Sequence, residues 1–379
     1  MMRIPICKPD IGDEEQKAVQ KVLASGHLAQ GEEVAAFESE FANYLGIPHA
    51  IATINGTTAL FVALKALGVS EGVKVVTTPF TFVATASAIL QCGGVPVFCD
   101  VDKKTFNIDP NQLEDILKRE SGVRGIVVVH LFGLPCAVEE IGFLARKYGV
   151  FLVEDCAQAH GALYSGRKVG SFGEAGVFSF YPTKNMTAGE GGMIVTNSEE
   201  LAGICRMLIN HGSRKRYVHE MLGYNFRLTD IGAAIGRVQL RKLDKNNQKR
   251  RENAHFYDRH LSGIPWIEIP FVPEGCFHVY HQYTLRIREK RDDLRSFLLA
   301  QGIGCEVYYP LPLHQQPFLR KILTPPRFPV AEKLCWEVLS IPVHPLLGEE
   351  ERWEIVESIR NFLMDSEKSF AEILKEENF

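Results

Sequence analysis

The stretch "FSFYPTKNMTAGEGGMIVT", residues 178–196, places a single lysine between two strand-like runs. The first run is apolar and stops at Pro182, and the second begins after the glycine cluster of residues 189–192. Since proline and glycine end regular elements, Lys184 is predicted to lie in the turn between two buried strands. The usual alternative for a lone lysine is a solvated position on the surface.

Upstream of this stretch, short β-branched runs alternate with helical patterns between Ile51 and Thr196. The runs are nearly continuous in apolar residues, which is typical of a mainly parallel sheet with helices on both faces. We therefore predict an α/β fold whose ligands bind where strands end and loops lead into helices. The strand-like runs are "HAIATI" (49–54), "KVVTTPF" (74–80), "VPVFCDV" (95–101), "GIVVVHLF" (125–132) and "VFLVED" (150–155).

A long helix is predicted over residues 230–261, with Thr229 as its N-cap. Its second half is strongly charged, so we expect that half to leave the core. The composition changes at Ser262. We therefore predict a large domain of residues 1–261 and a smaller C-terminal α+β domain of residues 262–379.

Two further segments carry expectations about the C-terminal domain. The helical pattern of residues 13–25 is expected to pack beside that domain or to bridge the two domains. The segment "HVYHQYTLRI", residues 278–287, alternates like a half-exposed strand. On a strand, the odd spacing of His278 and His281 would put them on opposite faces, so we reject a shared metal site.

Bulk properties exclude several classes of protein. The chain has 379 residues and a net charge of -4, so neither nucleic acid nor an anionic membrane surface is indicated as a partner. Nine scattered cysteines without a CxxC pair favour neither a disulfide framework nor a zinc ribbon, and fit a reducing cytoplasm. No signal peptide is visible at the N-terminus, and no apolar run approaches the ~20 residues of a membrane span.

Two ionisable residues point to carbonyl chemistry. Burial would lower the pKa of Lys184, and a neutral amine is a nucleophile toward carbonyl groups. Asp155 ends the run "VFLVED" at an edge of the predicted sheet. A carboxylate there is costly unless it meets a positive charge, such as the protonated pyridine nitrogen of pyridoxal phosphate (PLP). A helix cap or a structural ion pair is the alternative for Asp155.

A third signal is the segment "INGTTA", residues 54–59, in which a strand meets a helix. Backbone N–H groups and the helix dipole make an anion site there, and Thr57 and Thr58 can add hydroxyl donors. Plain helix capping is the alternative. No Walker lysine or GxGxxG pattern favours a nucleotide. Together the three signals predict a PLP enzyme.

With these residues in view, the sequence resembles the DegT/DnrJ/EryC1/StrS family of sugar aminotransferases, which are fold-type I PLP enzymes. The resemblance covers nearly the whole chain and implies a cofactor that cycles between PLP and its pyridoxamine form. It is carried by "GHLAQGEEVAAFE" (26–38), "GTTAL" (56–60), "PFTFVATA" (79–86), "PVFCDVDKKTFNID" (96–109), "VEDCAQAHGA" (153–162), "FSFYPTKN" (178–185), "GEGG" (189–192), "GYNFRLTDIGAAIG" (223–236) and "YYPLPLHQQP" (308–317).

The resemblance implies roles for residues around the cofactor ring. Lys184 would hold the cofactor aldehyde and move the proton during transfer. Asp155 would pair with the pyridine nitrogen, and Gln158 would reach the phenolic oxygen. Ala157 would pack on one face of the ring and Phe82 on the other, although ordinary core packing is the alternative for an aromatic residue in that motif.

The resemblance also implies the phosphate site and a partner subunit. Thr57, Thr58 and Ser179 would contact the cofactor phosphate. Asn225 would reach the phosphate of the partner subunit, so the active site would need a homodimer, and Arg227 would help at the same edge.

For the substrate, the basic segment "SRKRYVHE", residues 213–220, could meet the diphosphate of a nucleotide sugar through Arg214, Lys215 and Arg216. The alternative is a solvated charged face. His160 is either a substrate contact or a satisfied core histidine.

The expected function is the transfer of an amino group from an amino acid, in the first place glutamate, to a nucleotide-linked keto-sugar. The "GEGG" of residues 189–192 resembles members that act at C4 of the sugar more than the "GDGG" of C3 enzymes. A cyclitol or another cyclic ketone is the main alternative acceptor, and a non-catalytic PLP-binding regulator is a further one. The presence of Lys184 argues against the dehydratase branch of the family.

Overall fold

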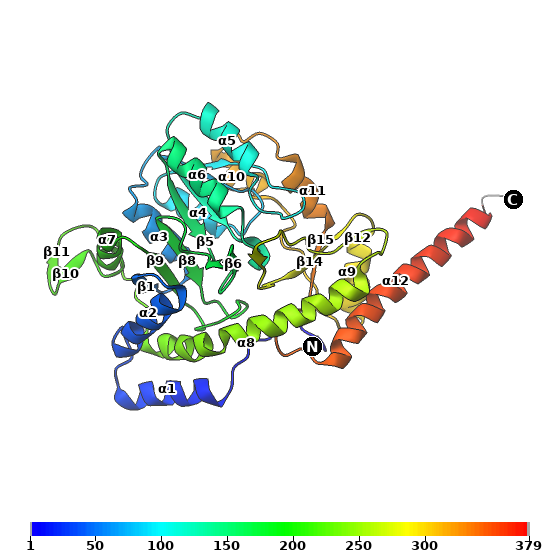
Figure 1. Cartoon of the computed structure of the whole chain (residues 1–379), viewed down its shortest axis with the longest axis horizontal. Helices are drawn as coiled ribbons and strands as arrows, with labels where there is room; N and C mark the ends of the chain where they lie inside the picture. The colour runs from blue at the N-terminus through cyan, green and yellow to red at the C-terminus, as the bar shows by residue number, and fades with distance from the viewer. Residues whose placement is uncertain (1, 377–379) are drawn as a thin grey trace.

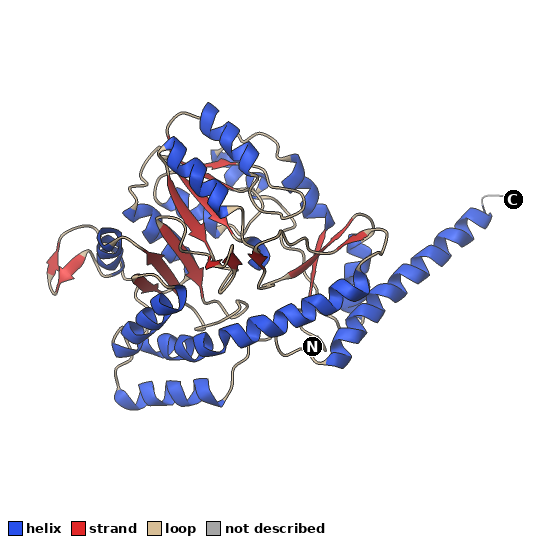
Figure 2. Cartoon of the chain, in the orientation of Figure 1, coloured by secondary structure: helices blue, strands red, loops and turns tan. Residues whose placement is uncertain are grey.

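The computed structural model describes residues 2–376, and the side chains of residues 2–362. A seven-stranded sheet lies at its centre (Figures 1 and 2). Its strands are β1 (His49–Thr53), β2 (Lys74–Thr77), β3 (Val95–Phe98), β4 (Val123–Val129), β5 (Phe151–Asp155), β8 (Ala175–Ser179) and β9 (Gly192–Thr196).

The strand order is β1-β9-β8-β5-β4-β2-β3. The neighbours from β8 to β3 pair in parallel, and β9 pairs antiparallel with both β1 and β8. The predicted α/β class with a mainly parallel sheet is therefore confirmed. The predicted turn around Lys184 connects β8 and β9.

Helices cover both faces of this sheet (Figure 1). In β4, Val127 packs with α3, α4 and α7 on one face, whereas Ile126 and Val128 pack with α5 and α6 on the other. Residues that point to both faces must therefore be apolar, which explains the continuous apolar runs. The helices are α2 (Glu32–Leu45), α3 (Gly56–Ala66), α4 (Ala84–Gln91), α5 (Pro110–Arg119), α6 (Val138–Tyr148) and α7 (Glu199–Ile209).

The chain after residue 261 forms a smaller unit around a second, antiparallel sheet of order β12-β14-β15. Whether residues 262–379 behave as a domain of their own stays a prediction, and residues 377–379 of that range lie outside the described residues. Its elements are β12 (Ile267–Glu268), β13 (Cys276–Phe277), β14 (Tyr283–Ile287), β15 (Val338–Ile341), α9 (Arg291–Ala300), α10 (Leu319–Ile322), α11 (Pro329–Glu337), α12 (Glu349–Glu376) and the 3-10 turn η2 (Leu313–Gln315).

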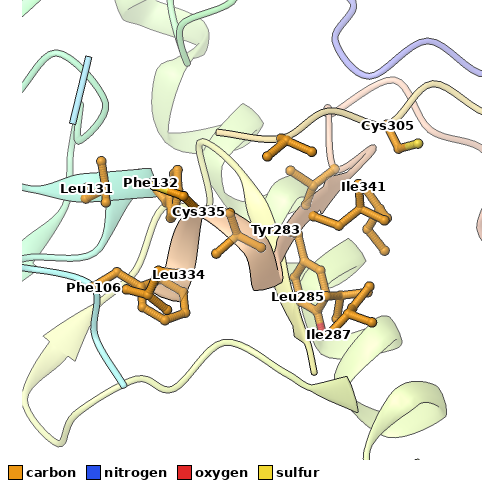
Figure 3. Close-up of a cluster of buried hydrophobic side chains, with 14 of the residues drawn as sticks. Phe106, Leu131, Phe132, Tyr283, Leu285, Ile287, Cys305, Leu334, Cys335 and Ile341 are labelled. Atoms are coloured by element: carbon orange, nitrogen blue, oxygen red, sulfur yellow. The ribbon is translucent and has the colours of Figure 1, made fainter. Parts of the chain in front are cut away.

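One hydrophobic core joins this unit to the main sheet. Figure 3 shows Phe106 and Phe132, which precede residue 262, beside Leu334 of α11. Tyr283 and Leu285 of β14 belong to the same buried cluster. The remaining short elements are the 3-10 turn η1 (Leu131–Gly133) and the strands β6 (Leu163–Tyr164), β7 (Arg167–Lys168), β10 (Ser213–Lys215) and β11 (Val218–His219).

The long helix α8 (Asp230–Leu261) begins where predicted, with the Thr229 hydroxyl accepting the N–H of Gly232. The expectation that its second half leaves the core is wrong. Polar side chains in that half are buried because they donate to carbonyls of neighbouring loops. These hydrogen bonds join Asn247 to His160 (2.8 Å), Asn253 to His344 (3.0 Å) and Tyr257 to Pro342 (2.9 Å).

The N-terminal helix α1 (Asp13–Ser25) does not pack on the second sheet. It lies against α8 (Figure 1), where Gln239 and Lys242 each donate to the buried carboxylate of Glu15 at 2.8 Å. The segment before α1 reaches the smaller unit instead. Ile4 forms a parallel bridge with Ile303 there. Among the described helices, none combines the length and apolar character that a membrane crossing requires.

Candidate active site

A cavity of about 460 Å³ opens where the parallel strands end. The ends of β4, β5 and β8 contribute to its wall, together with the starts of α3 and α4 and two loops of the smaller unit. Of the residues predicted from the sequence, those that line it are Thr57, Phe82, Asp155, Ala157, Gln158, Ser179 and Lys184. The structure therefore brings together the lysine, the carboxylate and the anion-binding turn.

Lys184 lies in a turn in which its N–H donates to the carbonyl of Tyr181 at 2.9 Å. The next residue fixes this turn, because the Asn185 amide donates to Asn247 of α8 at 2.8 Å and to the carbonyl of Val279 at 3.0 Å. The Lys184 side chain is half-buried within the cavity. Loss of hydration lowers the pKa of Lys184 to about 8, although Asp155 and Cys7 oppose the fall.

Asp155 is buried at the end of β5 and lines the same cavity as Lys184. One carboxylate oxygen accepts the N–H of Ala157 at 3.1 Å, and the other accepts the hydroxyl of Thr85 at 2.9 Å. Burial raises the pKa of Asp155, while those two donors and Lys184 act against the rise. A fixed, buried carboxylate without an arginine partner is suited to a ring N–H that carries positive charge.

The start of α3 is built as an anion site. Asn55 caps the helix by accepting the N–H of Thr58 at 2.9 Å, which leaves the N–H groups of Gly56 and Thr57 without a partner in the described chain. Gly56 is required because a Cβ there would lie 2.7 Å from the Cβ of Ser179. The hydroxyl of Thr58 donates to the carbonyl of Asn55 at 2.9 Å, so it is occupied within the cap, and Thr58 does not line the cavity.

Gln158 is held by two hydrogen bonds. Its amide oxygen accepts the N–H of Phe132 at 2.7 Å, and its amide nitrogen donates to the hydroxyl of Tyr309 at 3.0 Å. Burial raises the pKa of Tyr309, which therefore stays a neutral phenol and keeps its own proton for donation. Sequence reasoning did not single out Tyr309, although it stands in the motif "YYPLPLHQQP".

Besides Thr58 and His160, five of the predicted residues do not line this cavity. Asn225 is exposed and its backbone bridges to Asn210, whose side chain accepts from Arg227 at 2.5 Å. The other three are the exposed cations of the β10–β11 hairpin, Arg214, Lys215 and Arg216. Arg214 lines a separate cavity of about 840 Å³ beside α7.

His160 is buried behind the strands and does not line the cavity either. Its ring packs against Phe178 and Phe180, with centroids 5.4 and 5.8 Å away. Burial lowers the pKa of His160 to about 3, so the ring is neutral. This position favours the alternative of a core histidine.

The expected half-exposed strand over residues 278–287 is wrong in its first half. Only Tyr283–Ile287 is a strand, and the preceding loop is buried because Arg251 and Asn185 donate to its carbonyls. In that loop the ring of His278 stacks on Tyr280, whereas His281 lines the cavity. His278 and His281 therefore do not lie on opposite faces of one strand, contrary to the sequence-based prediction, because both precede the strand.

A separate buried cluster brings ligand atoms of His130, Glu154 and Cys156 within 4.8 Å of one another. Both ring nitrogens of His130 already have partners: one accepts the N–H of Cys136 at 3.1 Å, and the other lies 3.1 Å from Glu154. Glu154 also accepts the N–H of Gly170 at 2.8 Å. These contacts describe a structural hydrogen-bond network next to Asp155.

A family model for DegT/DnrJ/EryC1/StrS aminotransferases matches residues 9–360. The chain belongs to this family. The family is PLP-dependent, and the cavity fits that cofactor: it is lined by a lysine amine, a buried carboxylate and the start of α3 with its free backbone N–H groups. The predicted class of enzyme, an aminotransferase, is confirmed.

Two curated relatives are similar over almost their whole length. A pleiotropic regulatory protein of Geobacillus stearothermophilus is 43% identical over 359 residues, which cover 94% of this chain and 95% of that protein. The UDP-N-acetyl-3-dehydro-alpha-D-glucosamine 3-aminotransferase of Acidithiobacillus ferrooxidans is 41% identical, covering 93% and 94%.

Among solved structures, S. venezuelae DesV in complex with a ketimine intermediate is 37% identical and superimposes with a TM-score of 0.89. The match covers 92% of this chain and 94% of DesV. With this agreement the predicted fold-type I class is confirmed.

Proposed function

We propose that the protein transfers an amino group from an amino acid, with glutamate as the first candidate donor, to the ketone of a nucleotide-linked sugar. The observation that carries the proposal is the shared cavity of Lys184, Asp155 and the open start of α3. The family supplies the type of reaction, and the UDP-sugar aminotransferase at 41% identity supports the substrate class.

When bound, PLP supplies an electron sink that allows an amino group to pass between two carbonyl compounds. Lys184 would hold the cofactor aldehyde and then, in each half of the reaction, move the proton between the substrate carbon and the aldehyde carbon of the cofactor. Its lowered pKa suits both tasks, because the amine loses its proton near neutral pH. Asp155 would keep the pyridine nitrogen protonated.

The phosphate would be bound by the free N–H groups of Gly56 and Thr57 and by the hydroxyls of Thr57 and Ser179. Thr58 supports this site indirectly, since its hydroxyl holds the helix cap. We assign Ala157 and Phe82 to the two faces of the ring.

The remaining amide N–H of Gln158 would donate to the phenolic oxygen of the ring. The hydroxyl of Tyr309, which accepts from Gln158, would donate its proton within the same cavity.

A second copy of the chain would complete the site. Phe82 is 55% exposed at the mouth of the cavity, and Asn225 is exposed away from it. Both observations fit a homodimer in which Asn225 and Arg227 reach the partner's phosphate site. Arg214, Lys215 and Arg216 would then approach the diphosphate of the partner's nucleotide sugar.

The position of amination has two opposing indications. The "GEGG" turn, whose Glu190 lines the cavity, favours C4. The name of the UDP-sugar relative gives position 3. We keep C4 as the expected position and let the product decide.

The test is an amino-transfer assay with the PLP-loaded protein, glutamate, and UDP-, dTDP- and GDP-linked keto-sugars. Glutamate should shift the yellow absorbance of the protein, and one nucleotide class should yield an amino-sugar whose amine position is read by NMR. Lys184→Ala should abolish both. Turnover of a cyclitol ketone but of no nucleotide sugar would replace the proposal by its alternative.

A PLP-binding regulator is the second candidate, because the relative at 43% identity has a regulatory name. Such a protein would bind PLP without transferring an amino group to any acceptor. The presence of both Lys184 and Asp155 in one cavity favours catalysis. Formation of an aminated product by wild-type protein with glutamate and any of the keto-sugars would contradict the regulatory alternative.

A further inference from the structure

Another cavity, of about 560 Å³, shares no residue with that of Lys184 and is lined entirely by charged side chains. It forms where the turn after β3 meets β12, β14 and α11. Five of its six lining residues are cations, and one is a carboxylate. They are Lys103, Lys104, Glu268, Arg286, Arg288 and Lys333.

The local carboxylates do not balance this charge. Glu268 pairs with Arg286 at 3.3 Å and also with Arg288. Glu337, just behind the wall, pairs with Arg286 and, at 3.6 Å, with Lys333. Within the described residues, no carboxylate lies within ion-pair distance of the ammonium of Lys103 or Lys104. Five positive charges therefore face two negative ones.

The cationic wall is held in place before any ligand arrives. The Arg286 side chain is only 13% exposed, and carboxylates on β12 and α11 fix its guanidinium. The turn that presents the two lysines is closed by Asp102, which accepts the N–H groups of Lys104 and Thr105 at 3.0 and 2.8 Å. A site that is ordered in advance loses little entropy when it binds a ligand.

We propose that this cavity binds a phosphorylated anion of the diphosphate type, with at least two negative charges. A guanidinium presents donors in the fork that phosphate oxygens accept, and it has more donors than its two carboxylate contacts use. The ammonium groups of Lys103 and Lys104, which have no carboxylate partner among the described residues, add the charge that a dianion needs; that of Lys104 lies 5.3 Å from the centroid of the Phe271 ring. Acidic or neutral ligands without phosphate would gain much less binding free energy at this cavity.

The position of the site suggests what the anion would do. Lys103 and Lys104 precede residue 262, whereas Arg286 and Arg288 belong to the smaller unit, so the anion would hold the two parts together. The cavity shares no lining residue with that of Lys184. Lys104 also lines a small crevice whose other wall includes Phe132 and Gln282, two residues that line the Lys184 cavity.

The test is calorimetric titration of the PLP-loaded protein with inorganic pyrophosphate at constant ionic strength. The variant Lys103→Gln/Lys104→Gln removes the two unpaired charges. The matched control is Lys17→Gln/Lys21→Gln, which removes two exposed lysines of α1. All four lysines are exposed, so both variants should fold.

We expect a binding component in wild-type and control protein whose affinity falls about tenfold in the Lys103/Lys104 variant. Pyrophosphate that binds in the Lys184 cavity would be unaffected and remain as a separate component. Identical isotherms for all three proteins would overturn the proposal. A parallel titration uses UDP. If the affinity for UDP also falls about tenfold in the Lys103/Lys104 variant, the ligand is a nucleoside diphosphate. If only the affinity for pyrophosphate falls, the ligand is an inorganic or non-nucleoside diphosphate.

Discussion

The amine of Lys184 is subject to two opposing effects. Loss of hydration lowers its pKa to about 8 from 10.5, while the charges of Asp155 and Cys7 resist that change. Only the neutral amine attacks an aldehyde. We therefore expect the rate at which the apoprotein attaches PLP to rise with pH with a midpoint near 8, as measured by stopped-flow absorbance.

The variant Asp155→Asn sharpens this prediction. The aspartate raises the pKa of Lys184, so its removal should shift the midpoint to lower pH, even where the variant holds PLP more weakly. A wild-type midpoint close to 10 would mean that the amine is solvated and that the cavity does not desolvate it.

Tyr309 offers a second test at the level of one hydroxyl group. In Tyr309→Phe, the buried amide nitrogen of Gln158 would lose the hydroxyl to which it donates. A buried donor without a partner costs about 1–3 kcal/mol of free energy. Gln158 would then be held less firmly, and we expect the Kd for PLP to rise about tenfold in equilibrium dialysis.

The control is Tyr44→Phe, which removes a hydroxyl hydrogen bond to Asp244 away from the cavity. Its Kd for PLP should stay at the wild-type value. If both variants bound PLP like the wild type, Tyr309 would have no part in the cofactor site.

At the residue scale, the sequence locates a residue best where its type has one physical use at its position, and the roles of these residues stay predictions. Lys184 and Asp155 stand next to strand ends, and their charges demand partners. Thr58 was expected at the phosphate because a hydroxyl after a glycine suits that role. The sequence could not reveal that its hydroxyl closes the cap on Asn55 instead.

At the scale of elements, α8 shows why polar patterns mislead. The many charged residues in its second half predict a helix that leaves the core, yet asparagine, arginine and tyrosine side chains there are buried. They are buried because loops pack against the helix and their carbonyls need donors, which a helix pattern alone does not reveal. The strands were easier to predict, since burial on both faces leaves an apolar run that does not depend on distant loops.

This role of α8 can be measured at Asn247. Its amide donates to the His160 carbonyl and accepts from Asn185, the neighbour of Lys184. Asn247→Ala would leave the His160 carbonyl and one N–H bond of the Asn185 amide unpaired in a buried site, while Asn185 keeps its hydrogen bond to Val279. We therefore expect a loss of about 2–3 kcal/mol in the free energy of unfolding, measured with urea. The control is Gln248→Ala, at the next position, which removes only an exposed contact with Glu252. It should change the free energy of unfolding by less than about 0.5 kcal/mol. Equal effects of the two variants would show that the buried contacts do not stabilise the fold.

At the scale of the whole molecule, the segment around Ile4 packs on the smaller unit, although it lies at the other end of the sequence. The N–H of Gly304 donates to the carbonyl of Ile4 at 2.7 Å, and the Ile4 side chain lies in the core that Figure 3 shows. A contact between residues about 300 positions apart leaves no periodic signal in the sequence. The sequence therefore pointed to the helix of residues 13–25 as the bridge, whereas the extended segment before it makes the contact.

This placement predicts a local loss of stability when Ile4 is shortened. Ile4 is 1% exposed, so Ile4→Ala would leave a cavity and lower the free energy of unfolding by about 3 kcal/mol. Met2 is 44% exposed, so the control Met2→Ala should change that free energy little. The chain has three tryptophans, Trp266, Trp336 and Trp353, all in the smaller unit. Their fluorescence therefore reports unfolding of that unit, and its urea midpoint should fall in Ile4→Ala. If the midpoint stayed at the wild-type value, the N-terminal segment would not stabilise the smaller unit, and the pairing of Ile4 with Ile303 would not contribute to its stability.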